Sequence, residues 1–176
     1  MKNKLATINA IWIGPNLGPV HAACLQSFIN QGHRVVLHTY ECLKDKPEGV
    51  EYADANLLIP EDQKFIHRKT GSFAVFTDLL RYEILRQNLG LYVDCDIFCL
   101  KPIHDTDYIV GFQDSTINNA VLKMPADCPA LQELCAMRHH HFLPPWFSSL
   151  RRWKFKIRRL WGGGQFPRHE MGNPRP

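Results

Sequence analysis

The sequence predicts an α/β fold in which helices flank a largely parallel central sheet. Apolar runs of strand length alternate with helical stretches from the N-terminus onward, and this order builds parallel sheets. The run 33–40 contains consecutive Val35, Val36 and Leu37, as expected for a strand buried on both faces. Glycines stand where several of these segments are expected to end: Gly14, Gly32 and Gly90.

The expected elements follow in chain order. Strands are predicted within 5–14, 33–40, 90–100, 108–113 and 119–124, and helices within 20–32, 72–90 and 126–139. The helix in 72–90 has an apolar stripe at helical spacing, formed by Phe73, Phe76, Leu80 and Ile84. The stretch that contains Pro47, Gly49 and Pro60 is predicted to be a looser connection.

The 176 residues, of which 45% are hydrophobic, suit one globular domain with its own core. We expect this domain to span 1–137 and a basic region to span 138–176. No run approaches the ~20 apolar residues of a membrane-spanning helix. The N-terminus lacks the pattern of a signal peptide, so we expect Met1 to be the start and the protein to be cytoplasmic. The six cysteines form no C-x-x-C pair and are expected to be buried, reduced thiols.

Two aspartates interrupt the apolar run "GLYVDCDIFCL" at 90–100. Asp94 and Asp96 are two residues apart, so on a strand they point to the same face. If the strand ends near Val93, both lie at its carboxyl end, where ligands bind in such sheets. A buried carboxylate needs compensation, and Mg²⁺ or Mn²⁺ can supply it while also binding a substrate's phosphates. A second pair of this spacing, Asp105 and Asp107, is expected in a solvated loop.

A polar group is predicted on the helix that precedes this strand. Asp78 and Arg81 are three residues apart and lie, with Thr77, beside the apolar stripe. One interpretation is a half-buried ion pair that braces the helix. The other is a site in which Asp78 accepts from a sugar hydroxyl and Arg81 donates to a phosphate or hydroxyl.

Two segments resemble a known family. "FTDLLRYEILRQNLGLYVDCDIFCLKPI", residues 76–103, resembles the sugar-binding region of family-32 glycosyltransferases. Their pattern is a Ser/Thr-Asp-x-x-Arg-Tyr helix, a Gly, a short strand with Tyr, and Asp-x-Asp, and toxin glucosyltransferase domains share it. "AIWIGPNLGPVHAACLQSFINQGHRVVLHTYE", residues 10–41, resembles the nucleotide-binding half of the family. The resemblance covers roughly residues 8–125 and implies a GT-A fold, a Rossmann-type domain that binds a nucleotide-sugar.

The resemblance also implies roles for individual residues. Asp94 and Asp96 would hold Mn²⁺ or Mg²⁺. The donor sugar would lie against the motif residues of the helix and the strand: Thr77, Asp78, Arg81 and Tyr92. Trp12 and Ile13 would line the nucleobase pocket. Asn118 and Asn119 fall where the family often has a polar residue near the reacting sugar, although a turn at the start of a strand explains them equally well.

The resemblance implies that the protein transfers a sugar from a nucleotide-sugar to a saccharide or lipid-linked acceptor. A UDP-sugar is the favoured donor. We expect retention of the anomeric configuration and name no catalytic base. Family members continue with a Trp-Gly…Gly-Pro stretch and a closing segment, so this chain looks truncated beside them. Trp161 and Gly162 are either a trace of that stretch or a coincidence.

One alternative enzyme is a phosphatase of the haloacid dehalogenase type, which also places Asp-x-Asp after an apolar strand and uses the first Asp as nucleophile. Phe98 disfavours it, because that family prefers Thr or Val there. The phosphatase also needs a later acidic pair for Mg²⁺, whereas the acidic residues after Asp114 are scattered: Asp127, Glu133 and Glu170.

The other alternative is a non-catalytic protein that binds a membrane surface through its basic region. Between Arg138 and Arg168 there are eight Lys or Arg residues and no acidic residue. In 150–161 they share a predicted helix with apolar residues at helical spacing: Leu150, Trp153, Ile157, Leu160 and Trp161. Such a helix suits anionic lipid, but it can equally pack on its own domain. No nucleic-acid motif accompanies the charge, and the histidines 139–141 are expected at the surface.

Overall fold

The computed structural model describes residues 4–67, 71–136, 148–160 and 171–172. The strands are β1 (Ile8–Ile11), β2 (Val35–Thr39), β3 (Glu51–Asp54), β4 (Ile66–His67), β5 (Leu91–Val93), β6 (Ile109–Gln113), β7 (Thr116–Lys123) and β8 (Met171–Gly172). The helices are α1 (Pro19–Asn30), α2 (Ala74–Arg86), α3 (Pro129–Ala136) and α4 (Ser149–Leu160), with 3₁₀ turns at Ala55–Leu57 and Glu61–Gln63.

The central sheet has six strands in the order β3-β2-β1-β5-β7-β6. Strands β3, β2, β1 and β5 pair in parallel, whereas β7 is antiparallel to both of its neighbours. The predicted α/β fold with a mostly parallel sheet is therefore confirmed, and its arrangement is consistent with a Rossmann-like fold. The short strands β4 and β8 form a separate antiparallel pair.

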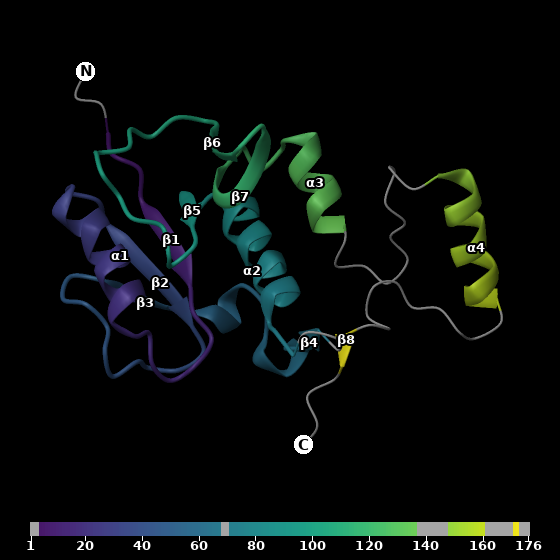
Figure 1. Cartoon of the computed structure of the whole chain (residues 1–176), viewed down its shortest axis with the longest axis horizontal. Coiled ribbons are helices and arrows are strands. Elements are labelled where there is room, and N and C mark those ends of the chain that lie inside the picture. Colours follow the sequence, from purple (N-terminus) through teal and green to yellow (C-terminus); the bar gives the residue numbers. More distant parts are fainter. Residues whose placement is uncertain (1–3, 68–70, 137–147, 161–170, 173–176) are drawn as a thin grey trace.

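Helices cover both faces of this sheet, with α1 on one face and α2 on the other (Figure 1). Alternate residues of each central strand enter different core clusters, as the pleat requires. Leu91 and Val93 of β5 pack in the cluster of α1, around Leu25 and Phe28. Tyr92, between them, packs in the cluster of α2, which includes the predicted stripe residues Phe76, Leu80 and Ile84.

Helices α1 and α2 end in the same hydrogen-bonding pattern, in which an N–H bonds to the carbonyl five residues earlier. Helix α1 ends where the sequence predicted, whereas α2 ends earlier. As expected, α1 closes at Gly32, which has φ 85°, and His33 N–H donates to the Phe28 carbonyl. The prediction that Gly90 ends α2 is wrong. The helix ends at Arg86, and Asn88 takes the left-handed conformation with φ 54° while Leu89 N–H donates to the Ile84 carbonyl.

Two further expectations need correction. The looser connection contains a strand, β3, that extends the sheet beside β2; its residues are mostly exposed, so it has no apolar pattern to reveal it. The run 90–100 is not one buried strand, because β5 ends at Val93. Phe98 and Leu100 are 59% and 83% exposed, and neither belongs to the core.

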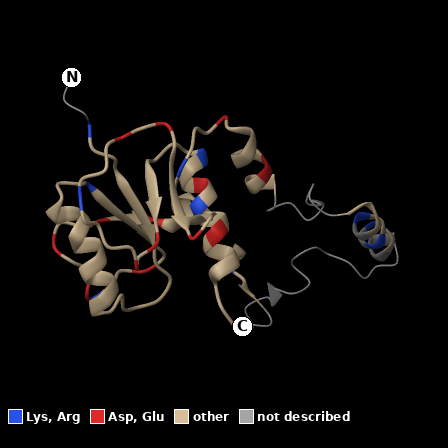
Figure 2. Ribbon diagram, turned by 45° about the horizontal axis from the view of Figure 1, so that its top comes forward, with Lys and Arg blue, Asp and Glu red and all other residues tan. Residues whose placement is uncertain are grey.

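The described part of the C-terminal region is mainly the basic helix α4, which carries no acidic residue (Figure 2). Within the described residues, no helix has the length and apolar character needed to cross a membrane. All six cysteines are free; Cys24, Cys95 and Cys99 are buried as expected, whereas Cys42 is exposed. The predicted surface histidines 139–141 and the pair Trp161 and Gly162 lie outside the described residues.

Candidate functional site

A pocket of about 540 Å³ opens at the carboxyl edge of the sheet, where β1 and β5 end. This is the edge at which parallel α/β sheets bind ligands. Its walls come from the segment after β1, the first half of α2 and the turn after β5. Eight of the ten residues predicted for the site line it: Trp12, Ile13, Thr77, Asp78, Arg81, Tyr92, Asp94 and Asp96.

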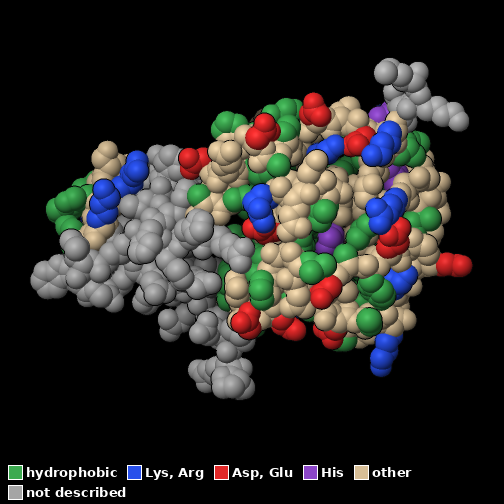
Figure 3. Space-filling model, turned by 180° about the vertical axis from the view of Figure 1, so that it is seen from behind, with side chains coloured by type: hydrophobic (Ala, Val, Ile, Leu, Met, Phe, Trp, Pro, Cys, Tyr) green, Lys and Arg blue, Asp and Glu red, His purple; other side chains and the backbone are tan. Residues whose placement is uncertain are grey.

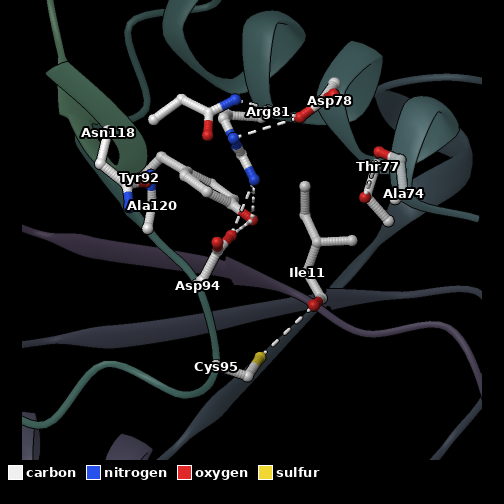
Figure 4. A network of polar contacts seen from close by, with 11 residues as sticks. Ile11, Ala74, Thr77, Asp78, Arg81, Tyr92, Asp94, Cys95, Asn118 and Ala120 are labelled. Carbon is white, nitrogen blue, oxygen red and sulfur yellow. Dashed lines mark hydrogen bonds and ion pairs between the residues drawn. The ribbon is translucent and has the colours of Figure 1, made fainter. Parts of the chain in front are cut away.

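Asp94 is held from three directions. Oδ1 accepts hydrogen bonds from Arg81 Nη2 at 2.8 Å and from the Tyr92 hydroxyl at 2.6 Å (Figure 4). Asp94 N–H donates to the Ala120 carbonyl of β7 at 2.8 Å, which continues the pairing of β5 with β7 beyond the end of the strand. The carboxylate therefore has a defined orientation, and Oδ2 has no such partner in the described part of the chain.

Arg81 forms the floor of this side of the pocket. It is 5% exposed and its guanidinium lies over the Tyr92 ring, 4.4 Å from the centroid. Besides Asp94 it pairs with Asp78, whose Oδ1 is 3.2 Å from Nη1. Even so, Nε and Nη1 are buried without a hydrogen-bond acceptor among the described residues. A buried donor without an acceptor costs about 1–3 kcal/mol, and a bound water, ion or ligand can remove that cost.

Burial and the positive charge of Arg81 act in opposite directions on the pKa of Asp78. Burial raises the pKa of its carboxyl; the Arg81 charge opposes this rise and Asp94 adds to it. Asn119 donates to Asp78 Oδ1 at 3.2 Å. Thr77, one residue earlier, also lines the pocket. Its hydroxyl donates to the Ala74 carbonyl at 2.8 Å and can therefore act toward a ligand only as an acceptor. The bracing ion pair and the pocket wall are thus the same group of residues.

Asp96 differs from Asp94 in being exposed. It forms no hydrogen bond or ion pair with another described residue, yet it lines the same pocket. The expectation that both carboxylates are buried and need a compensating ion is therefore wrong for this residue. Asp94 is compensated by Arg81 and Tyr92, and Asp96 by solvent.

The residues present nevertheless fit a hard divalent cation. Asp78 and Asp94 both pair with Arg81, and Asp96 lines the same pocket, so the three carboxylates and the guanidinium together carry a net charge of −2 when all are ionised. Carboxylate oxygens are the ligands that Mg²⁺ and Mn²⁺ prefer. The described residues contain no cluster of three or more His, Cys, Asp or Glu side chains around one point. A cation held by Asp94 and Asp96 would therefore take its other ligands from water and from a phosphate.

Trp12 and Ile13 form the opposite wall, directly after β1. Trp12 Nε1 donates to the Asn16 carbonyl at 3.0 Å, and its ring lies 4.6 Å from that of His21, tilted by 51°. Trp12 and His21 therefore present two aromatic rings in this wall, and a planar base can stack on such rings. Cys95 Sγ donates to the Ile11 carbonyl at 3.3 Å and joins the ends of β1 and β5 behind this wall.

Asn118 and Asn119, the other two residues predicted for the site, do not line this pocket. They line a second pocket of about 460 Å³, formed by β6, β7, α2 and α3. Asn119 nevertheless reaches the first pocket through its hydrogen bond to Asp78.

Sequence reasoning missed His21, Ser72 and Phe73 as lining residues. The first turn of α1 follows β1 and had to face the same edge of the sheet. That order along the chain could have indicated His21.

No protein-family model matches the chain, and a search of curated proteins finds no similar sequence. The class that fold and site define is thus an α/β protein with a six-stranded, mostly parallel sheet and an acidic, indole-walled pocket at its carboxyl edge. Its lining combines carboxylates, a guanidinium and an indole.

Proposed function

We propose that the protein is a metal-dependent glycosyltransferase of the GT-A type that uses a nucleotide-sugar, most readily a UDP-sugar. The observation that carries the proposal is that three segments distant in the sequence line one pocket. An indole after β1, an Asp–Arg pair on α2 and a carboxylate pair after β5 line the same cavity. These three groups match the base, the sugar and the metal-bound diphosphate of such a donor.

Each part of the donor has a partner in the pocket. The base stacks against Trp12 and lies beside Ile13. Asp94 and Asp96 would hold Mn²⁺ or Mg²⁺, which as a Lewis acid would stabilise the charge on the departing diphosphate. Asp78 accepts from sugar hydroxyls. Arg81, 5% exposed, acts mainly by orienting Asp78 and Asp94, and its positive charge favours an anionic leaving group nearby.

The phosphatase alternative requires the first aspartate to attack as a nucleophile. In Asp94, one oxygen already accepts two hydrogen bonds, from Arg81 and Tyr92. Strong hydrogen bonds from a guanidinium and a phenol lower the electron density available for attack. The arrangement supports a ligand-holding carboxylate better than a nucleophile.

Thermal unfolding with Mn²⁺ and UDP tests the proposal. A ligand that binds only the folded state raises the melting temperature, by linkage. We expect Mn²⁺ plus UDP to raise it, and Asp94→Asn or Asp96→Asn to abolish the rise. Asp107→Asn is the matched control, because Asp107 is exposed and has no ion pair with another described residue, and it should behave like the parent protein. Asp105, in contrast to the expectation of a solvated pair, forms an ion pair with Lys123 of β7 and does not serve as a control.

Two results would count against the proposal. One is an unchanged shift in both Asp94→Asn and Asp96→Asn. The other is a failure of Mn²⁺ plus UDP, and of Mn²⁺ with other nucleoside diphosphates, to shift the parent protein. If Mn²⁺ plus a nucleoside diphosphate does raise the melting temperature, a screen of nucleotide-sugars that measures released nucleotide would identify the donor sugar.

A further inference from the structure

The second pocket is linked to the first by the hydrogen bond between Asn119 and Asp78 but differs from it in chemistry. It lies between the β6–β7 hairpin, α2 and α3, and none of the described residues that line it carries a charge. Its polar residues are amides and a hydroxyl: Gln113, Thr116, Asn118 and Asn119. Its apolar residues are Tyr82, Ile117, Leu122, Met124 and Leu134.

The polar groups retain hydrogen-bonding capacity of both signs. Asn118 Nδ2 donates to Gln113 Oε1 at 2.8 Å, which orients both amides. Gln113 Nε2 has no acceptor among the described residues, so its two protons are available. Thr116 Oγ1 donates to the Gln113 carbonyl at 3.0 Å and keeps its lone pairs. Groups that both donate and accept match hydroxyl groups, which do the same.

An apolar surface borders these amides. Tyr82 is 7% exposed and forms part of the inner wall. Ile117, which lines the pocket, is 64% exposed and pairs across the hairpin with Phe112, which is 68% exposed. Exposed apolar side chains that adjoin a pocket with a few directed polar groups are typical of a binding site. A pyranose ring presents both a C–H face and a hydroxyl edge, which suits this surface.

A β-bulge connects the two pockets. The pairing of β6 with β7 shifts between Val110 and Gly111, which oppose Leu122 and Asn118, so residues 119–121 are extra on β7. The bulge directs Asn119 toward α2, where it donates to Asp78. Bulges commonly re-aim a side chain in this way. Asn119 thus connects the two pockets, because it lines the second and hydrogen-bonds a residue in the wall of the first.

We infer that the second pocket binds an uncharged saccharide, the acceptor, and discriminates against sugars that carry a carboxylate or phosphate. The acceptor role rests on the proposed function, whereas the selectivity for neutral sugars follows from the lining alone. Among the described lining residues there is no cation that would neutralise an anionic sugar. Beyond Asn119, the acidic first pocket would repel it.

The side-chain amide signals of Gln113, Asn118 and Asn119 in ¹H–¹⁵N spectra provide a direct readout of the second pocket. The ligands are methyl glycosides of neutral hexoses, with glucuronate and glucose 6-phosphate as anionic counterparts. Each is added alone and again with Mn²⁺ and UDP. We expect the neutral glycosides to shift these signals in both conditions and the anionic sugars to leave them unchanged.

Substitutions of Gln113, which is exposed, test separately how the side-chain amide and the charge at this position affect sugar binding. Gln113→Ala should weaken neutral binding several-fold. Gln113→Lys should allow the anionic sugars to bind. The expected gain in their affinity is about tenfold, which corresponds to one charge-assisted hydrogen bond. Gln132→Lys makes the same change on the exposed side of α3, outside the pocket, and should bind like the parent protein.

The outcomes distinguish this inference from the proposed function. If Mn²⁺ plus UDP binds and depends on Asp94, but no neutral glycoside shifts the three amides, the inference is overturned and the proposed function stands. Equal shifts by glucuronate and by neutral sugars would also overturn it. If neutral glycosides bind and nucleotide does not, the saccharide pocket is supported and the transfer reaction is rejected.

Discussion

Among the carboxylates of the first pocket, Asp78 has its pKa raised, chiefly because burial disfavours the charged form. Its nearest cation, Arg81, opposes this rise but also pairs with Asp94. A charged Asp78 at neutral pH is therefore held at some cost in stability. Residues retained against stability are typical of functional sites.

Asp78→Asn should consequently stabilise the fold at pH 7. A raised folded pKa means that the folded state binds the proton more tightly than the unfolded chain does. The associated stability is full below the unfolded value of 3.8 and is lost as pH rises through the folded pKa. The asparagine variant avoids this loss. Because the Asp78 side chain is 37% exposed, the gain should be below about 1 kcal/mol.

Urea unfolding at pH 7 and below pH 3.8 measures this difference, which should be present at the higher pH and vanish at the lower. If Asp78 contacts the donor sugar, the variant should bind the UDP-sugar more weakly while binding UDP as before. A loss of stability at pH 7 with unchanged sugar affinity would make Asp78 a bracing residue only.

At the scale of elements, the turn from α2 into β5 positions the site. Gly90 has φ 134°, and a Cβ at this residue would lie 2.4 Å from the Thr7 carbonyl oxygen and 3.0 Å from Asn9 Nδ2. Glycine thus lets β5 begin directly against β1, which brings Asp94 to the edge where Trp12 lies. The close approach involves backbone, so no side-chain rotation relieves it.

Gly90→Ala should destabilise the protein by roughly 2–5 kcal/mol, the sum of a backbone clash and strain at a positive φ. Gly71→Ala is the matched control, because Gly71 also has a positive φ, 65°, but no atom within 4 Å of the added Cβ. It should cost about 1–2 kcal/mol. Denaturant unfolding compares the two, and equal costs would contradict the role given to the close approach.

The same elements show what the sequence could and could not predict. The stripe of α2 and the buried runs of β2 and β5 follow from apolar spacing, and the segments that carry Trp12, Asp78 and Asp94 were placed correctly by their order along the chain. Strand β3 could not be recognised, because its exposed residues carry no pattern. The second pocket depends on the bulge in β7, a register shift between strands that no local signal encodes.

At the scale of the whole molecule, the charges are divided between two regions. The described body carries interspersed acidic and basic side chains on the face seen in Figure 3, with the acidic pocket at its sheet edge. Helix α4, by contrast, consists of basic and apolar residues after Ser149 at its start. Leu150 and Trp153 of α4 are 63% and 59% exposed. An exposed apolar face beside cations supports the proposal that α4 contacts an anionic membrane surface, at which a lipid-linked acceptor would be presented.

Binding to vesicles should therefore have two components. Each Lys or Arg near an anionic surface contributes about 1 kcal/mol at best, and this attraction decays within a Debye length of ~8–10 Å. Burial of Trp153 adds a component that salt does not remove. Sedimentation with vesicles that contain phosphatidylserine should show binding that falls steeply with salt yet leaves a remainder, and Trp153→Ala should eliminate that remainder.

Two controls separate this interaction from general stickiness. Vesicles of phosphatidylcholine alone should bind poorly. Leu57→Ala removes an apolar side chain that is 76% exposed outside α4 and should change nothing. If the helix instead packs on its own domain in solution, anionic vesicles will leave tryptophan fluorescence unshifted and Trp153→Ala will lower the melting temperature. That outcome would remove the membrane from the proposal but leave the nucleotide pocket intact, because Trp12, Asp78 and Asp94 share no contact with α4 among the described residues.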